Sequence, residues 1–285
     1  MKNIFNLIVI ISIFSACNKD NRITISSVVS AEDNSLIESE FISIYDIAQD
    51  VISNNLDIKN SSKLLPKGVL LLFTDSLYSD GNGLDFKLDF GDVKREFPNG
   101  ILCLDGRYRA GILHFKTNKK YEESGFFCEI LANELDSFFA GNDGGKLSLI
   151  FGKKIISRVN NSTFNILVEN GKIKNENGTI SWNCDRTVEL LRENNPVIME
   201  LGYQVTGVAD GINRNGEIYT ATIEEPLIKK SKRDCLKTYI IGTIKLTDKK
   251  ANNKITIDYD PFNNKDCDLV IKATLKSKEF FFDLK

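Results

Sequence analysis

Short turn-forming sequences divide most of this chain into runs of strand-forming residues, and this pattern limits the folds that the chain can adopt. After Pro66, runs rich in β-branched and aromatic residues alternate with turn sequences such as DGNG, ENGK and NRNG. Asn-Gly and Asp-Gly pairs reach positive φ at low cost and suit the two-residue turns of β-hairpins. The predicted strands do not alternate with helices, as they would in a parallel sheet. The pattern therefore predicts a mainly β fold, a large antiparallel meander of about a dozen strands.

One amphipathic helix is expected before the strands. In the stretch SLIESEFISIYDIAQDVISNN, apolar residues recur at steps of three and four, which is the helical period. Asn34 and Ser35 can cap the start of this helix, and Asn54 and Asn55 can end it. We expect a helix over about residues 36–54 that packs its apolar face on the sheet. Strand counting leaves a sandwich, an open barrel and a twisted single sheet all open.

The N-terminus carries an export signal that ends in a cysteine. Lys2 precedes an apolar run, Ile4–Phe14, that is too short to span a bilayer, and Ser15-Ala16 leads to Cys17. Small residues before a cysteine resemble the lipobox of bacterial lipoproteins, in which a diacylglycerol is attached to the cysteine sulfur. The alternative is an ordinary export signal. We expect a signal peptide over 1–16, a tether lipidated at Cys17 over 17–35, a helix and linker over 36–65, and an all-β domain over 66–285.

Five cysteines follow Cys17, so at least one thiol stays free in an exported protein. If the hairpin centred near Ala251 pairs without a bulge, opposed residues have numbers that sum to 502, as Cys235 and Cys267 do. Opposed strand residues lie within the distance that a disulfide bridges, so this pair is the leading candidate. Pro261 lacks a backbone donor and can introduce a bulge that shifts the register. The pairing of the other cysteines stays open: Cys103, Cys128 and Cys184.

Several local sequences resemble a large group of uncharacterised lipoproteins from the phylum Bacteroidota, over about residues 84–285. They are a strand that ends in Asp-Phe-Gly, a cysteine before a Gly-Arg-x-Arg-x-Gly strand start, a Gly-x-Asn-x-x-Gly turn before a Pro-Leu, and a Cys-Asp pair. In this chain they are Asp89–Gly91, Cys103, Gly106–Gly111, Gly211–Gly216, Pro226-Leu227 and Cys267-Asp268. The resemblance implies a lipid-anchored, mostly β domain and brings no activity and no catalytic residues.

No hydrolase, zinc-protease or phosphate-loop motif is present, so we assign no catalytic residue. The turn at Gly211–Gly216 lacks the ligand spacing of an EF-hand and is interpreted as a hairpin. His114 alternates with the apolar Leu113 and Phe115, which predicts a solvent-facing strand residue. Two further expectations concern a calcium site and O-glycosylation at Ser76 in the sequence DSL. The candidate metal ligands are Asp258, Asp260, Asp266 and Asp268.

The nearly balanced net charge of −2 argues against nucleic acid as a partner. We expect an outer-membrane lipoprotein, on the periplasmic or the cell-surface face, held in the membrane by its N-terminal lipid. Its expected role is non-enzymatic binding or structural support, with an envelope protein or a glycan as partner. One alternative is a secreted glycan-active hydrolase that uses paired Asp residues, which requires Asp89, Asp258 and Asp268 to cluster in one deep cleft. The other is a carrier of apolar ligands inside an open barrel.

Overall fold

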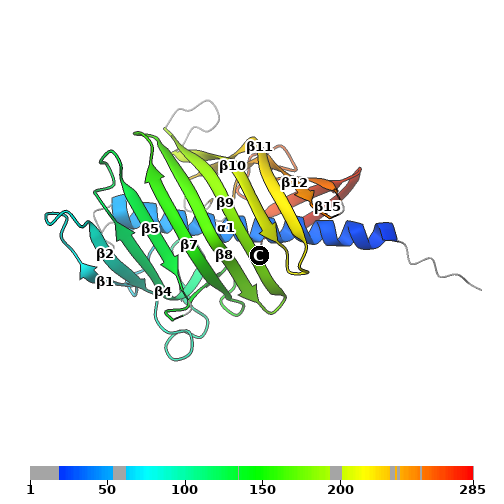
Figure 1. Ribbon diagram of the computed structural model, residues 1–285. Coiled ribbons are helices and arrows are strands. Elements are labelled where there is room, and N and C mark those ends of the chain that lie inside the picture. Colours follow the sequence, from blue (N-terminus) through cyan, green and yellow to red (C-terminus); the bar gives the residue numbers. More distant parts are fainter. Residues whose placement is uncertain are drawn as a thin grey trace, which may run out of the picture.

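The structure is a computed structural model of the 285-residue chain. It describes residues 19–53, 62–133, 135–192, 201–231, 235, 238–250 and 252–284, with side chains from residue 27 onwards. In this part of the chain, one sheet of 15 strands curves around one long helix (Figure 1). The predicted fold class, mainly β and antiparallel with an N-terminal helix, is confirmed. Of the architectures left open, the structure shows a single sheet.

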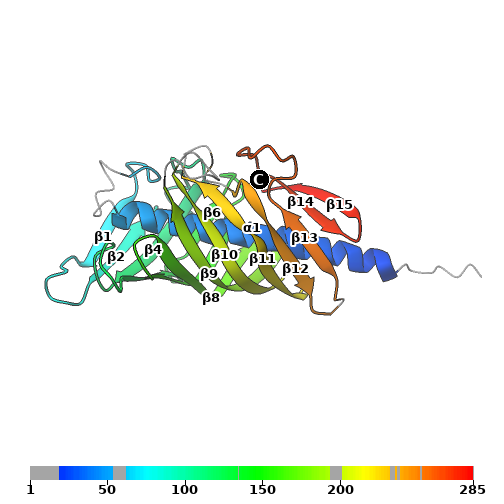
Figure 2. The same cartoon turned by 90° about the horizontal axis from the view of Figure 1, so that it is seen from above.

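Helix α1 (Lys19–Ser53) lies along the concave face of the sheet (Figure 2). Its end agrees with the predicted helix, but its start is corrected, because the segment expected to be a polar tether is helical from Lys19. The apolar period is missing before Leu36 because, apart from Ala31, the buried side chains described there are polar. Asp33 and Asn34, for example, have no exposed surface. A search for apolar periodicity does not detect a helix that buries polar groups.

The strands follow one another along the chain, and each neighbouring pair in the sheet is antiparallel. The sheet order is β1-β2-β4-β5-β7-β8-β9-β10-β11-β12-β13-β14-β15, with β3 beside β4, and β6 beside β4 and β7. The strand bounds are β1 (Leu70–Asp75), β2 (Leu84–Asp89), β3 (Ile101–Leu102), β4 (Tyr108–Thr117), β5 (Phe127–Ala132), β6 (Phe138–Gly141), β7 (Ser148–Arg158), β8 (Thr163–Asn175), β9 (Gly178–Leu191), β10 (Gly202–Ile212), β11 (Ile218–Lys230), β12 (Ile241–Asp248), β13 (Lys254–Asp258), β14 (Val270–Leu275) and β15 (Lys278–Asp283).

Glycines with positive φ lie where the sheet bends. Gly111, in the middle of β4, has a φ of 83°, and a Cβ there would lie 1.6 Å from the carbonyl oxygen of Ser137. Gly242, on β12, has a φ of 115°, and its Cβ would lie 2.5 Å from the carbonyl oxygen of Pro226, beside the register shifts between β11 and β12. Glycine kinks and bulges allow a sheet to curve strongly. Here they let it curve around α1.

The sheet and its loops cover α1 on all sides. All residues from Ile37 to Ala48 are buried, whereas a helix on a flat sheet would bury one face only. The amide of Asn142, after β6, donates a hydrogen bond to the carbonyl oxygen of Leu284, after β15. The segment after the last strand therefore contacts the segment between β6 and β7, and α1 forms part of the core.

Cys235 and Cys267 form a disulfide, with their Cα atoms 4.9 Å apart, as predicted. The register differs from the expected one, because Thr243 pairs with Asp258, so that opposed residues sum to 501. Both cysteines lie outside the paired segments of β12 and β13. The other three cysteines, Cys103, Cys128 and Cys184, are buried free thiols.

Candidate functional site

Within the described residues, acidic side chains of α1 meet basic side chains of the sheet and of its connecting segments at four places. The pairs are Asp33–Arg214, Glu38–Arg186, Glu40–Arg107 and Asp46–Lys229. Glu38 and Glu40 are two residues apart, so they point about 200° apart around the helix, and they reach β9 and the segment before β4. The charge pairs therefore hold α1 from opposite sides.

The central pair is fully inside the protein. Arg186 donates from Nε to Glu38 Oε1 at 3.3 Å and from Nη2 to Oε2 at 2.5 Å, and the side chains are 3% exposed. Burial opposes the charge on Arg186, but the adjacent Glu38 carboxylate outweighs it and raises the pKa of the arginine. A buried pair adds little net stability, whereas the loss of one partner is costly. The pair therefore mainly fixes the position of α1 on the sheet.

Asp46 and Lys154 show two ways of burying charge near the end of α1. Asp46 accepts hydrogen bonds from Tyr203 Oη and Lys229 Nζ, each at 2.7 Å. Lys154 Nζ donates to the carbonyl oxygen of Phe41 at 2.5 Å, and no carboxylate of the described residues lies within 4 Å of it. Burial lowers the pKa of Lys154 to about 8, and burial also lowers that of Lys229, although Asp46 opposes this.

The Gly-Arg-x-Arg-x-Gly sequence supplies two of the buried cations. Arg107 and Arg109 have no exposed surface. Arg109 donates to both oxygens of Asp105, at 2.9 and 2.6 Å, while Arg107 donates to Ser39 Oγ at 3.3 Å and pairs with Glu40. The spacing of two places both arginines on one face of the strand, and this was the available sequence signal for a charged interior.

The turn between β10 and β11 is a hairpin, as predicted, and it also binds α1. The amide of Asn213 donates to Ser30 Oγ at 2.8 Å. The backbone N–H and the Nε of Arg214 donate to the two oxygens of Asp33, at 2.7 and 2.6 Å. The turn between β10 and β11 therefore reverses the chain and also binds α1 through the side chains of Asn213 and Arg214.

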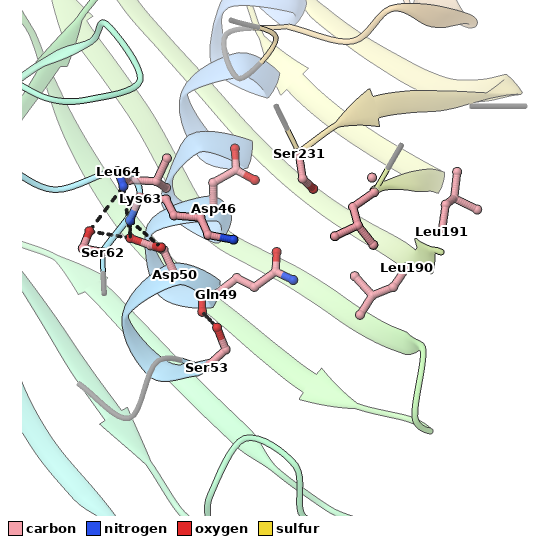
Figure 3. A pocket seen from close by; sticks show the side chains of 12 residues that line it. Asp46, Gln49, Asp50, Ser53, Ser62, Lys63, Leu64, Leu190, Leu191 and Ser231 are labelled. Atoms are coloured by element: carbon pink, nitrogen blue, oxygen red, sulfur yellow. Dashed lines mark hydrogen bonds between the residues drawn. The ribbon is translucent and has the colours of Figure 1, made fainter. Parts of the chain in front are cut away.

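A pocket of about 500 Å³ opens at the C-terminal end of α1 (Figure 3). We call it the α1 pocket. One helix face forms its polar wall, because Gln49 and Asp50 lie three and four residues after Asp46, and Ser53 lies four and three residues after them. Leu190 and Leu191 at the end of β9 and Leu201 before β10 form an apolar wall. Ser62, Lys63, Leu64, Gly202 and Ser231 complete the lining.

Both carboxylates of the α1 pocket are already engaged. Asp50 accepts hydrogen bonds from Ser62 Oγ at 2.6 Å and from the backbone of Lys63 and Leu64 at 3.0 and 3.2 Å. Asp46 is held by Lys229 and Tyr203, as described above. The volume lies in the range of small-molecule sites, and the lining combines an apolar wall with a few fixed polar groups. The pocket therefore suits a small molecule with a polar end and an apolar body.

The four aspartates proposed for calcium do not form a site. Among the residues that the structure describes, no three His, Cys, Asp or Glu side chains come together so that they could hold a metal ion. Asp258 pairs with Lys272 at 3.3 Å. The other three, Asp260, Asp266 and Asp268, accept hydrogen bonds within the segment that connects β13 to β14. Their carboxylates are therefore used for turn formation.

The aspartates expected for a hydrolase lie apart, and the interior expected for a carrier of apolar ligands is filled. Asp89 lies on β2 and Asp258 on β13, which are far apart in the strand order, and Asp89 accepts a hydrogen bond from the backbone N–H of Gly91 at 2.8 Å. The concave face is occupied by α1, and the space beside Lys154 and Arg186 measures about 10 Å³. That is about the room for one water molecule.

His114 lies on β4 with its ring on the face away from α1, as alternation predicts, and Leu113 and Phe115 are buried. Its Nε2 is 2.5 Å from Asp136 Oδ2, and Lys87 Nζ is 3.1 Å from the same oxygen. The hydrogen bond from Lys87 holds the pKa of Asp136 below its usual range. The sequence pattern did not indicate Asp136 as a partner of His114, because Asp136 lies outside the strands, in the segment between β5 and β6.

Modification is expected at two positions, Ser76 and Cys17. Ser76 is exposed directly after β1, where a glycan has room. Cys17 lies outside the described residues.

No helix in the described part of the chain has the length and apolarity needed to cross a bilayer. No protein-family model, no curated protein and no solved structure matches this chain.

Proposed function

We propose that this protein is a lipid-anchored protein of the outer membrane with a non-enzymatic binding role. Helix α1 connects an anchor at Cys17 to the ligand pocket at its other end. The observation that carries the proposal is the continuity of this helix. It begins at Lys19, two residues after Cys17, passes through the core, and ends at Ser53 in the wall of the α1 pocket.

The helix gives the anchor a fixed geometry. A helix of 35 residues is about 52 Å long, so the α1 pocket lies far from the first helical residue. Each buried acyl methylene contributes about 0.8 kcal/mol, so two or three chains on Cys17 hold the protein stably. The ion pairs along α1 prevent it from sliding in the sheet. The pocket is thereby held at a distance from the bilayer. At that distance a molecule of the envelope can reach it.

The state of the charged groups supports binding rather than catalysis. The carboxylates that line the α1 pocket are hydrogen-bonded to Lys229, Tyr203 and the segment 62–64, so they shape the pocket. Gln49, Lys63 and Ser231 are the further polar groups at its surface. We infer a small amphipathic ligand, whose polar end meets these groups and whose apolar part packs on Leu190 and Leu191.

The anchor is tested by metabolic labelling with an alkyne fatty acid in a bacterial host. Wild type should be labelled and should sediment with membranes. Cys17→Ser should lose the label, because the acceptor sulfur is absent, whereas Cys103→Ser should keep it. An unlabelled wild type, or a label that persists in Cys17→Ser, would contradict the anchor.

The pocket is tested by native mass spectrometry of protein purified from envelopes. Leu190→Trp fills the α1 pocket, and Leu167→Trp makes the same change at an exposed position on β8. Wild type and Leu167→Trp should carry a small molecule, and its occupancy should fall about tenfold or more in Leu190→Trp. Equal occupancy in the two variants, or a wild type without a bound molecule, would argue against the binding role.

A further inference from the structure

Five exposed lysines occupy two hairpins at the end of the molecule where α1 begins. Lys249, Lys250 and Lys254 belong to the β12–β13 hairpin, and Lys276 and Lys278 belong to the β14–β15 hairpin. Figure 2 shows both hairpins extending toward the side from which the start of α1 emerges. We call these five residues the basic end.

Two acidic groups next to the basic end, Asp248 and Glu279, have partners other than the side chains of its five lysines. Asp248 is buried, and it accepts hydrogen bonds from Ser27 Oγ at 3.4 Å and from the backbone N–H of Lys250 at 3.0 Å. Glu279 lies 3.6 Å from Lys272. Among the described residues, no carboxylate comes within ion-pair distance of any of the five lysines. The basic end therefore presents net positive charge to solvent, although the whole chain has a net charge of −2.

The β12–β13 turn is also tied to the first described side chains of α1. Asn253 donates from Nδ2 to Ser27 Oγ at 3.2 Å, next to the contact between Ser27 and Asp248. From Ser27 back to Lys19 the helix covers about 12 Å. This distance is longer than the Debye length at physiological ionic strength, about 8 Å, so the lysines act on a membrane at the start of the helix when the protein tilts and brings this end closer to the surface.

We propose that the basic end binds the anionic phospholipid surface of the membrane that holds the anchor, and so sets the tilt of the protein. The inference rests on the proposed lipid anchor, because the anchor brings this end to the bilayer. A lysine close to an anionic surface strengthens partitioning about fivefold. The five together suffice to orient a protein that its lipid already holds at the surface.

The test uses the mature chain, residues 17–285, with Cys17→Ser, so that no acyl chain contributes. Sedimentation with phosphatidylcholine vesicles is compared with sedimentation with vesicles that contain about 30% phosphatidylglycerol. The test variant replaces the five lysines of the basic end by Gln. A matched control makes the same change at five exposed lysines near the other end of the sheet, Lys67, Lys94, Lys116, Lys119 and Lys120.

The parent and the matched control should prefer the anionic vesicles, and salt should weaken this preference. The test variant should bind them at least a hundredfold less tightly, which corresponds to about three of the five lysines each contributing the full fivefold. Absence of a preference in the parent, or an equal loss in the control, would overturn the inference. Neither outcome depends on acylation, which fatty-acid labelling of Cys17 tests separately. The two proposals can therefore fail independently.

Discussion

Arg186 on β9 and Glu38 on α1 are separated by 148 residues in the sequence and form a buried ion pair with two hydrogen bonds. The pair lies at the centre of a series of contacts in which acids of the helix meet bases of the sheet. Desolvation makes such pairs poor sources of net stability, but a mispositioned helix would leave charges buried and alone. The series therefore selects one rotation and one axial position of α1.

Removal of one partner of this pair should be costly. Arg186→Met leaves Glu38 buried without its cation and should lower the free energy of unfolding by about 3–5 kcal/mol in urea titrations. The double variant Glu38→Leu/Arg186→Met should recover most of this loss. As a control, Lys245→Met breaks the exposed pair with Glu224 and should cost less than about 1 kcal/mol. A double variant as unstable as Arg186→Met would refute the pairing argument.

Lys154 should make stability depend on pH. Its folded pKa of about 8 is below the unfolded value, so the unfolded state binds more protons between about pH 8 and 10.4. The free energy of unfolding contributed by this group therefore rises with pH across that window. Lys154→Met should be more stable than wild type at pH 7, by up to about 3 kcal/mol less the lost contacts, and the difference should shrink by pH 10. If the difference between the urea midpoints of Lys154→Met and wild type stays constant from pH 7 to 10, the prediction is wrong.

Two glycines with nearly the same φ should respond differently to the same substitution. A Cβ at Gly111 would lie 1.6 Å from a carbonyl oxygen, whereas Gly216, with a φ of 80°, has no atom within 4 Å of its Cβ position. Gly216→Ala should cost about 1–2 kcal/mol, the price of a left-handed conformation for a residue with a Cβ. Gly111→Ala should cost clearly more or prevent folding. Similar melting temperatures for the two variants would count against the role of Gly111 in bending the sheet.

The cysteines should divide sharply by reactivity. Burial raises the pKa of the Cys103, Cys128 and Cys184 thiols, so native protein should not react with iodoacetamide at pH 8, whereas unfolded protein should react at all three. Peptide mapping without reduction should find Cys235 joined to Cys267. Replacement of both by Ser should lower stability by about 3–4 kcal/mol on the chain-entropy account. Rapid labelling of the native protein would contradict the buried thiols.

The disulfide shows how a correct prediction can rest on an incomplete reason. The sequence argument opposed Cys235 and Cys267 through a register that sums to 502, but the strands pair at 501. The cysteines lie beyond the ends of this pairing, in irregular segments that bring their Cα atoms to 4.9 Å. Hairpin arithmetic placed them close together, whereas the bridge itself depends on the path of the chain outside the strands.

The sequence by itself determined the strands, the Asn-Gly hairpins and the presence of an N-terminal helix, because turn chemistry and side-chain alternation are local. Only the tertiary structure decided that α1 begins at Lys19 and lies inside a curved sheet. The same holds for Arg107, Arg186 and Lys229, which meet acids of the helix. The physical reason is that the local sequence pattern predicts a solvent-exposed position for a charged residue. Only long-range packing supplies the partner that allows its burial.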